Sequence, residues 1–173
     1  MTLSVDERRR HMVSTLERMS AEIGDEPVFA RVFSRKEHVW LDEVPRTTFD
    51  ELEQRGYVHI EEFFGGNRNY QLTPAGWLKA LMTSDRIDSQ AERERRETFL
   101  KHLKSKVSAR AGNEVVDGRE VAAETGLPGG WVFNAVESQL LDHCYPNRHF
   151  RLVTNDGYDI VIPPTFGLEP VDL

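Results

Sequence analysis

The sequence has little cysteine, no long apolar run and no excess of positive charge. Cys144 is the single cysteine among 173 residues, so an internal disulfide framework is excluded and a reducing compartment is expected. No stretch approaches membrane-spanning length, and Met1 to Arg10 lacks the hydrophobic core of a signal peptide. We therefore expect a soluble, cytoplasmic protein that does not contact a membrane.

The net charge of −7 argues against a protein that coats nucleic acid nonspecifically, because phosphate binding depends on clustered lysine and arginine. It leaves open specific binding through a local basic face. Hydrophobic residues make up 39% and charged residues 29% of the chain, which is ordinary for a globular protein. The length allows one domain or two small ones.

Motifs for catalysis and for cofactors are also missing. His143-Cys144 and His149 lie close together in the sequence, but there is no Cys-x-x-Cys and no His-Glu-x-x-His. Leu127-Pro-Gly-Gly130 lacks the Lys-Ser/Thr of a phosphate-binding loop, and a turn between helices explains it better. We expect a non-enzymatic protein with no cofactor and no metal.

Residues 5–23 are predicted to form a helix. Ser4 and Glu7 have capping-box spacing at its start, and Gly24 follows as a stop. Met12, Leu16, Met19 and Ile23 step by four, three and four residues, which places them on one stripe. The stripe packs either on its own domain or against a second copy as a dimer seam, and a homodimer stays open.

Two short helices are predicted next. Ser34-Arg-Lys-Glu37 has a capping pattern that indicates one helix, which Pro45 ends. Thr48-Phe-Asp-Glu51 repeats the pattern and opens another, which ends at Gly56. The segment Pro27–Phe33 fits either a strand or a helix.

A β-hairpin and a helix follow in the sequence. β-Branched and aromatic residues from Tyr57 to Phe64 favour a strand, Gly65-Gly66 favours a turn, and Tyr70 and Leu72 lie on the returning strand. Thr73 then caps a new helix with Pro74 at its first position.

The composition changes at residues 83–98, where charged residues dominate. This segment is either a solvated helix laced with charge pairs or a linker. We place the domain boundary here, with a first domain at 1–82, a second at 99–168 and a tail at 169–173.

The second half repeats the pattern of the first. We expect a helix from Phe99, a strand at Val115-Val116 and a helix that Asp117 caps and Gly126 stops. A further helix, Trp131–His143, carries its apolar face at Val132, Val136, Leu140 and Leu141. A hairpin over 149–162 turns at Asn155-Asp156-Gly157. Trp40, Trp77 and Trp131 are expected as anchors of the core or of an interface, and core burial is the favoured interpretation of Trp131.

These patterns resemble winged helix-turn-helix proteins, in tandem. The first half is most similar to regulators of the MarR and PadR type, through Leu52, Arg55-Gly-Tyr-Val58, the hairpin, and Leu72-Thr-Pro-Ala-Gly76. Residues 99–162 give a second match. The resemblance implies an α+β, mainly helical fold with two winged helix-turn-helix domains, each with a C-terminal hairpin wing.

In DNA-binding members of this family, the second helix of the motif enters the major groove and the wing contacts the backbone or the minor groove. By position, the helix here is Thr47–Arg55 and the wing tip is Gly65–Asn69. Asp50, Glu51 and Glu53 share that helix and would repel phosphates. The implied nucleic-acid contacts are Arg46, Thr47, Thr48, Gln54, Arg55, Asn67, Arg68 and Asn69.

The second motif has weaker readers. Its helix offers Asn134, Ser138 and Gln139 and contains no lysine or arginine. Basic residues gather instead on Arg8–Arg10 and on Phe99–Gly112, where Lys101 and Lys104 are further candidate phosphate contacts.

The leading functional hypothesis is a regulator of transcription that binds double-stranded DNA through its first motif and wing. The alternative is a protein-interaction module, in which acidic winged-helix scaffolds dock a protein partner and DNA is not bound.

Overall fold

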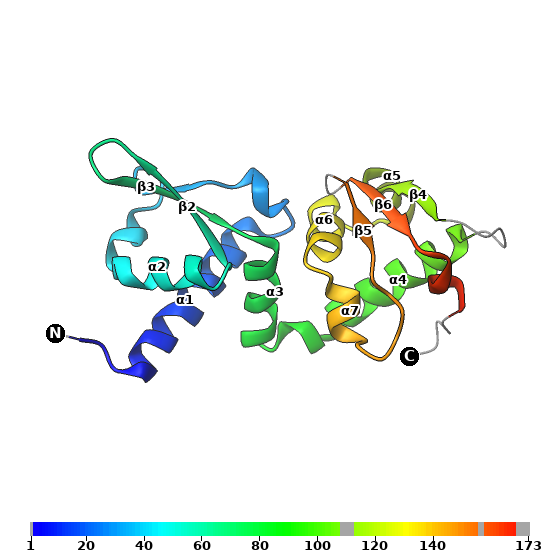
Figure 1. Ribbon diagram of the computed structural model, residues 1–173, viewed down its shortest axis with the longest axis horizontal. Coiled ribbons are helices and arrows are strands. Elements are labelled where there is room, and N and C mark those ends of the chain that lie inside the picture. Colours follow the sequence, from blue (N-terminus) through cyan, green and yellow to red (C-terminus); the bar gives the residue numbers. More distant parts are fainter. Residues whose placement is uncertain (1, 108–112, 156–157, 169–173) are drawn as a thin grey trace. The chain divides into compact units, whose positions relative to one another are not determined.

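A computed structural model describes residues 2–107, 113–155 and 158–168 of the chain (Figure 1). The chain divides into two compact units, Met1–Ser84 and Asp85–Leu173. Each unit combines helices with one three-stranded antiparallel sheet, so the fold is α+β. The division falls within the charged segment, and residues 85–98 belong to the second unit rather than to a separate linker.

The first unit begins with a long helix and ends with a hairpin and a further helix. Its elements in chain order are α1 (Val5–Ile23), the 3-10 helix η1 (Val28–Ala30), β1 (Phe33–Ser34), the 3-10 helix η2 (Val39–Glu43), α2 (Arg46–Gln54), β2 (Val58–Phe63), β3 (Asn67–Leu72) and α3 (Pro74–Thr83).

Helix α1 has the predicted bounds and caps. The Ser4 side chain accepts a hydrogen bond from the Glu7 backbone, Glu7 bonds back to Ser4, and Gly24 ends the helix. Leu16, Met19 and Ile23 are buried, and the helix contacts α2 and α3. The C-terminal part of the stripe therefore packs within its own unit.

The sheet of the first unit has the order β1-β3-β2. The hairpin runs in register from Val58 opposite Leu72 to Phe63 opposite Asn67. Gly65 and Gly66 have φ angles of 83° and 77°, which glycine adopts without strain, so the predicted turn is confirmed. The undecided segment before Ser34 contains η1 and the start of β1, where buried Phe33 pairs with Tyr70.

Two predicted helix starts are wrong. Ser34 is not a helix cap, because it pairs with Asn69 in the sheet and the following helix is the 3-10 segment η2, which begins after His38. Thr48 is not a cap either. Helix α2 begins at Arg46 after Pro45, and the Thr48 backbone N–H donates to the Pro45 carbonyl. Pro45 is itself the extended residue before the helix, so the cap lies three residues upstream of Thr48.

The predicted start of α3 is confirmed. The Thr73 hydroxyl accepts from the Gly76 backbone at 3.0 Å, and Pro74 is the first helical residue. A side chain at Gly76 would meet the Tyr57 carbonyl, so the glycine allows α3 to approach the base of the hairpin. Trp77, the next residue, is buried in the core as expected.

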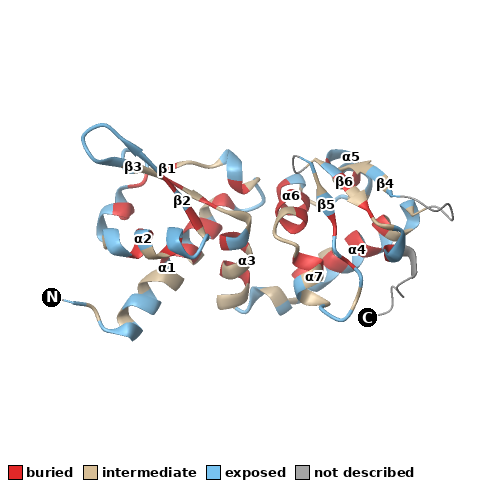
Figure 2. Cartoon of the chain, in the orientation of Figure 1, coloured by how far each residue is buried: buried red, intermediate tan, exposed pale blue. Residues whose placement is uncertain are grey.

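The second unit consists of the 3-10 helix η3 (Arg86–Asp88), α4 (Gln90–Lys106), β4 (Glu114–Asp117), α5 (Gly118–Thr125), α6 (Gly129–Glu137), α7 (Leu140–Cys144), β5 (Val153–Thr154), β6 (Asp159–Ile162) and the 3-10 helix η4 (Pro164–Leu168). Ile160, Ile162, Leu140 and Phe99 are among its most buried side chains. Figure 2 marks these cores in red within each unit.

The charged segment is mostly helical and is not fully solvated. Helix α4 begins at Gln90, with the Ser89 side chain as its cap, and continues past Phe99. Glu92 and Arg96 are buried, and the Glu92 Oε2 accepts a hydrogen bond of 2.8 Å from the Trp131 indole. The indole of Trp131 therefore stabilises the buried carboxylate of Glu92. The composition of residues 83–98 does not reveal this partner, because it lies far along the chain.

The predicted helix Trp131–His143 is interrupted. Helix α6 ends at Glu137, and Gln139 has a φ of 57° before α7 begins at Leu140. The Gln139 side chain donates to the Leu152 carbonyl at 2.6 Å and accepts from the Leu152 backbone N–H at 3.2 Å. The contact between Gln139 and Leu152 is therefore made at the point where the predicted helix is broken.

The second sheet has the order β4-β6-β5, so both sheets place the first strand beside the third. Val153 pairs with Val161 and Thr154 with Ile160, which confirms a hairpin over 149–162. Of its predicted turn, Asp156 and Gly157 lie outside the described residues. Gly126, with a φ of 74°, ends α5 as predicted.

Candidate nucleic-acid interface

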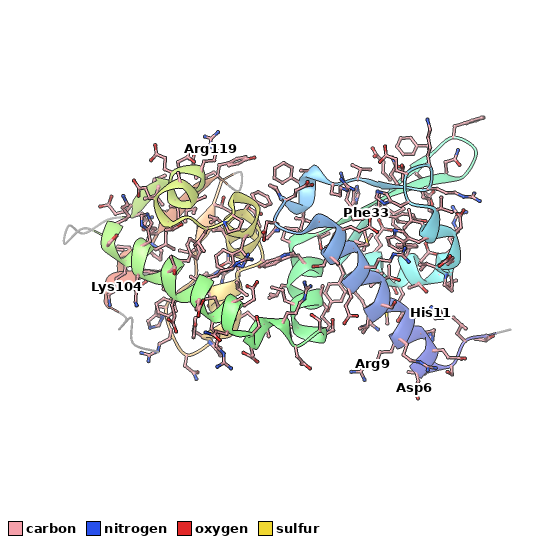
Figure 3. All side chains as sticks on the ribbon, turned by 180° about the vertical axis from the view of Figure 1, so that it is seen from behind. Asp6, Arg9, His11, Phe33, Lys104 and Arg119 are labelled. Carbon is pink, nitrogen blue, oxygen red and sulfur yellow. The ribbon has the colours of Figure 1, made fainter. Side chains whose placement is uncertain are left out.

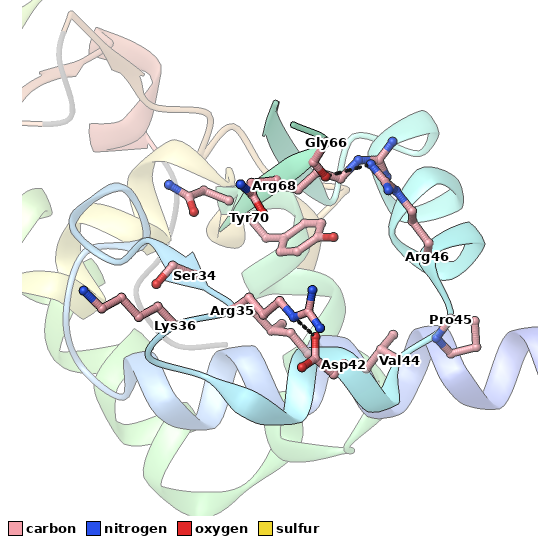
Figure 4. Close-up of a pocket in the computed structure, with 13 residues that line it drawn as sticks. Ser34, Arg35, Lys36, Asp42, Val44, Pro45, Arg46, Gly66, Arg68 and Tyr70 are labelled. Atoms are coloured by element: carbon pink, nitrogen blue, oxygen red, sulfur yellow. Dashed lines mark hydrogen bonds and ion pairs between the residues drawn. The ribbon is translucent and has the colours of Figure 1, made fainter. Parts of the chain in front are cut away.

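Four of the predicted contact residues, Arg46, Asn67, Arg68 and Asn69, line a groove of about 820 Å³ in the first unit (Figure 4). It lies between the β1–η2 connection, the start of α2 and the returning strand of the hairpin. We call it the basic groove, because cationic side chains outnumber carboxylates along it. Its lining residues include Arg35, Lys36, Asp42, Arg46, Asn67, Arg68, Asn69 and Tyr70.

Arg46 connects the start of α2 to the tip of the hairpin. It is the first residue of the helix, and its Nη2 donates to the Gly66 carbonyl at 3.3 Å. The same nitrogen lies 3.8 Å from a carboxylate oxygen of Glu62. About half of the Arg46 side chain, 56%, is exposed, so Arg46 binds the hairpin tip and still faces solvent.

Arg68 is held more firmly. Its guanidinium lies 2.6 Å from Asp50 of α2 and 2.6 Å from Glu62 of β2, and its side chain is only 15% exposed. Charge-assisted bonds of this length are among the stronger hydrogen bonds in proteins. Arg68 therefore joins the helix to the hairpin, and two carboxylates offset its charge.

The acidic residues of α2 have structural partners. Asp50 binds Arg68, and Glu51 lies 3.1 Å from Arg55 one turn later. Glu53 accepts a hydrogen bond of 2.9 Å from the Ile60 backbone N–H, which orients the helix against β2. Each of these three carboxylates therefore has a partner within the unit, and two of them are paired with Arg55 and Arg68.

The other sequence-predicted residues of the first motif are dispersed. Thr47 and Gln54 are exposed and line a second hollow with Asp50, Glu51 and Arg8. Arg55 lines a third hollow with Arg8, Arg9 and Lys79. The prediction for Thr48 is wrong, because its side chain is only 4% exposed and faces the core.

The basic cluster near the N-terminus lies on the first turns of α1. Arg8, Arg9 and Arg10 are exposed there, and Figure 3 shows Arg9 and Asp6 projecting from this end of the helix. Arg8 and Arg9 share the third hollow with the apolar side chains of Val5 and Met12.

The second unit offers fewer candidate contacts. Lys101 is exposed on α4 and Lys104, labelled in Figure 3, is half-buried near its end. Glu124 of α5 lies 2.9 Å from Lys106 and 3.0 Å from His102, so this basic segment has a carboxylate beside it. Arg110 lies outside the described residues.

The predicted readers of the second motif are wrong. Asn134 is fully buried on α6, and Gln139 binds the backbone of Leu152. Ser138, between α6 and Gln139, has a hydroxyl oxygen that is itself buried. Side chains that the fold covers cannot contact base edges.

Sequence reasoning missed four residues beside the interface. The sequence predicts Arg35 and Lys36 within a short helix, but that helix begins only at Val39, and both residues line the basic groove, where Arg35 forms an ion pair with Asp42. Phe63 is 47% exposed and Phe64 is fully exposed at the hairpin tip. The signal for the phenylalanines was their position directly before Gly65-Gly66, beyond the part of the strand that covers the core.

Other site chemistry is limited. In the part of the chain that the structure describes, no three His, Cys, Asp or Glu side chains lie close enough together to hold a metal ion. Burial raises the pKa of the Cys144 thiol, which disfavours the reactive thiolate. No described helix combines the length and apolar character needed to cross a membrane.

Comparisons of the chain with protein-family models, with curated proteins and with solved structures found no match.

Proposed function

We propose that each unit is a winged helix-turn-helix domain. The order of elements in the first unit supports this: a helix, a short strand, a helical turn, the helix α2 and then a hairpin. The second unit has a similar succession, with α7 added between α6 and the hairpin, and both sheets have the order first, third, second strand. In this assignment α2 is the second helix of the motif, and β2 and β3 form the wing.

We further propose that the protein is a non-enzymatic regulator that binds double-stranded DNA through the basic groove of its first unit. The observation that carries the proposal is the meeting of Arg35, Lys36 and Arg46 with Arg68, Asn67 and Asn69 along one groove. Four of these six were implied by the resemblance. Cations and amide donors of this kind bind phosphate oxygens and position a protein on a duplex.

The groove supports contact with the backbone more than reading of bases. The carboxylates of α2 are engaged inside the unit, and Thr48 is buried, which leaves Thr47 and Gln54 as exposed polar residues of this helix. We expect affinity that falls steeply with salt and discriminates weakly among sequences.

Electrophoretic shift of a mixed-sequence duplex at low salt tests the proposal. Lys36→Ala and Arg46→Ala should each weaken binding about three- to tenfold and reduce the salt dependence by about one phosphate contact. Arg93→Ala removes the same charge from an exposed position of α4 and should leave binding unchanged. Equal effects of all three variants would indicate nonspecific charge attraction and would contradict the groove as the site.

The second candidate function is a protein-interaction module. The ion pairs of Arg68 and Arg55 favour it, because they lower the positive charge available beside α2. This candidate predicts no duplex shift with micromolar protein even at low salt. Such a result would exclude the DNA proposal and leave protein docking.

A further inference from the structure

Phe64 is the most exposed large apolar side chain of the described chain, with a relative exposure of 103%. It lies beyond the last residue of β2, directly before Gly65 and Gly66. Figure 2 shows the hairpin projecting from the unit with its tip exposed. A side chain this open adds no packing to the fold, so its apolar surface is available to a partner.

The hairpin tip is slender and held in place. Its two glycines carry no side chains, and the Gly66 N–H donates to the Phe63 carbonyl at 3.2 Å. Arg46 binds the Gly66 carbonyl, and Arg68 binds Asp50 and Glu62. These bonds tie the backbone beside Phe64 to α2, so less backbone order has to be gained on binding.

The size of the apolar tip distinguishes between classes of partner. A stable protein interface buries about 800 Å² on each side. Two phenylalanine side chains bury roughly 150–250 Å² each, which is too little for such an interface by itself. A wedge between two base pairs, by contrast, needs one apolar side chain beside cations that hold the backbone.

We infer that Phe64 inserts into the minor groove of double-stranded DNA and partly unstacks a base step. This inference rests on the proposed function. The minor groove is about 6 Å wide, which a hairpin tip with two glycines enters more readily than a helix does. Arg46, which binds the Gly66 carbonyl and is 56% exposed, then lies beside the tip where it can approach a flanking phosphate. Flexible pyrimidine–purine steps, above all TA, should be preferred because they unstack most easily.

The test uses the full chain and a mixed-sequence duplex that carries 2-aminopurine at its TA steps, since this base fluoresces more strongly when it is unstacked. Wild-type protein should shift the duplex and raise the fluorescence. Phe64→Ser should weaken binding about tenfold, as the loss of one aromatic stacking contact does elsewhere, and abolish the fluorescence rise. Phe64→Leu keeps an apolar wedge and should retain part of both signals.

Val39→Ser is the matched control, because Val39 is 71% exposed in the same unit and lies on η2 rather than on the hairpin. It should behave as wild type in both readouts, and none of the variants should change the thermal unfolding of the first unit.

The outcomes separate the two proposals. If wild-type protein shifts no duplex, the DNA-binding function fails and the wedge fails with it. If Lys36→Ala weakens binding while Phe64→Ser binds and unstacks as wild type does, the function stands and the wedge is wrong. If Phe64→Ser leaves the duplex signals unchanged but alters the sedimentation of the protein alone, the tip contacts a second copy of the chain instead.

Discussion

Arg68 shows how a single residue links the architecture of the first unit to its proposed activity. Its guanidinium contacts one carboxylate from α2 and one from β2, so the same bonds that orient the hairpin also offset a charge in the basic groove. At a partly exposed site such ion pairs contribute little to folding stability. Their main effect is on the position of the hairpin relative to α2 and on the electrostatic potential in the basic groove.

Replacing Asp50 by Asn tests how far the carboxylates beside Arg68 reduce the positive charge of the basic groove. The change removes one negative charge beside the groove and keeps a side chain of the same shape, so we expect duplex affinity to rise about two- to fivefold at low salt. Asp6→Asn removes a charge from the exposed first turn of α1 and serves as the control. Unchanged affinity in Asp50→Asn would mean that Arg68 does not approach a phosphate.

Asp117 provides a prediction that depends on pH. Hydrogen bonds from the Arg119 side chain and backbone lower the pKa of this carboxyl from 3.8 to about 2. Because the folded pKa lies below the unfolded one, the contribution to stability is present above pH 4 and is lost as the pH falls towards 2. Asp117→Ala should therefore lower the unfolding temperature of the second unit by a few degrees at pH 6, and the difference should shrink as the pH falls through 2.

Thermal unfolding followed by circular dichroism across that range measures the effect. A difference that stays constant down to pH 2 would show that the loss arises from packing rather than from the charged cap. Glu120→Ala, one turn into the same helix, controls for charge in the first turn of α5.

At the scale of elements, close contacts at a few positions determine how helices and strands pack against one another. Gly76 allows α3 to approach the Tyr57 carbonyl at the base of the hairpin. Gln139 separates α6 from α7 and fills the backbone hydrogen bonds of Leu152. Each residue couples two elements that local sequence preferences would leave independent.

Gly76→Ala should destabilise the first unit. An added Cβ would lie 2.0 Å from the Tyr57 carbonyl oxygen, and a backbone atom cannot give way without displacing the helix. Overpacking of this kind costs about 3 kcal/mol. Gly129→Ala, whose Cβ would meet nothing within 4 Å, should be neutral. Urea denaturation compares the two, and equal free energies of unfolding would contradict the contact.

Gln139→Ala should destabilise the second unit. The change leaves the Leu152 N–H and carbonyl without their side-chain partner, and Leu152 is only 3% exposed. Unsatisfied buried groups of this kind cost roughly 2 kcal/mol. Gln90→Ala, at an exposed position of α4, is the control. Gln139→Gly removes the same bonds and relieves the positive φ, so it should lose somewhat less.

At the scale of the whole molecule, the chain consists of two units that each have a core of their own. The first unit buries Phe33, Phe49 and Trp77, and the second buries Phe99, Trp131 and Phe166. Separate cores permit separate cooperative transitions. Differential scanning calorimetry should therefore show two transitions, with Gly76→Ala lowering one and Gln139→Ala lowering the other. A single transition that both variants shift equally would mean that the units unfold together.

Several elements could be predicted because their causes lie close together in the chain. The capping box of Ser4 and Glu7, the Gly65-Gly66 turn, and Thr73 before Pro74 all act within a few residues, and all three form as predicted. The candidate site was predictable only in part. Arg46, Asn67, Arg68 and Asn69 line one groove, whereas Thr48 and Asn134 are buried.

The incorrect predictions have a common physical reason. Ser34 left its predicted helix because it pairs with Asn69, 35 positions later in the chain. Glu92 is buried because the indole of Trp131 donates to it, and α6 ends early because Gln139 reaches Leu152. In each case a partner distant in sequence outweighed a local preference, and no window of neighbouring residues contains that partner.

The sequence by itself determined the α+β composition, the hairpins and most helix ends, since caps, turns and apolar periodicity act over one or two turns of chain. Only the tertiary structure decided which charges meet. It brought Arg35, Lys36, Arg46 and Arg68 into one groove, set Asp50 and Glu62 against Arg68, and left Phe64 in solvent. Electrostatic pairing and burial depend on distances between segments, and folding alone sets those distances.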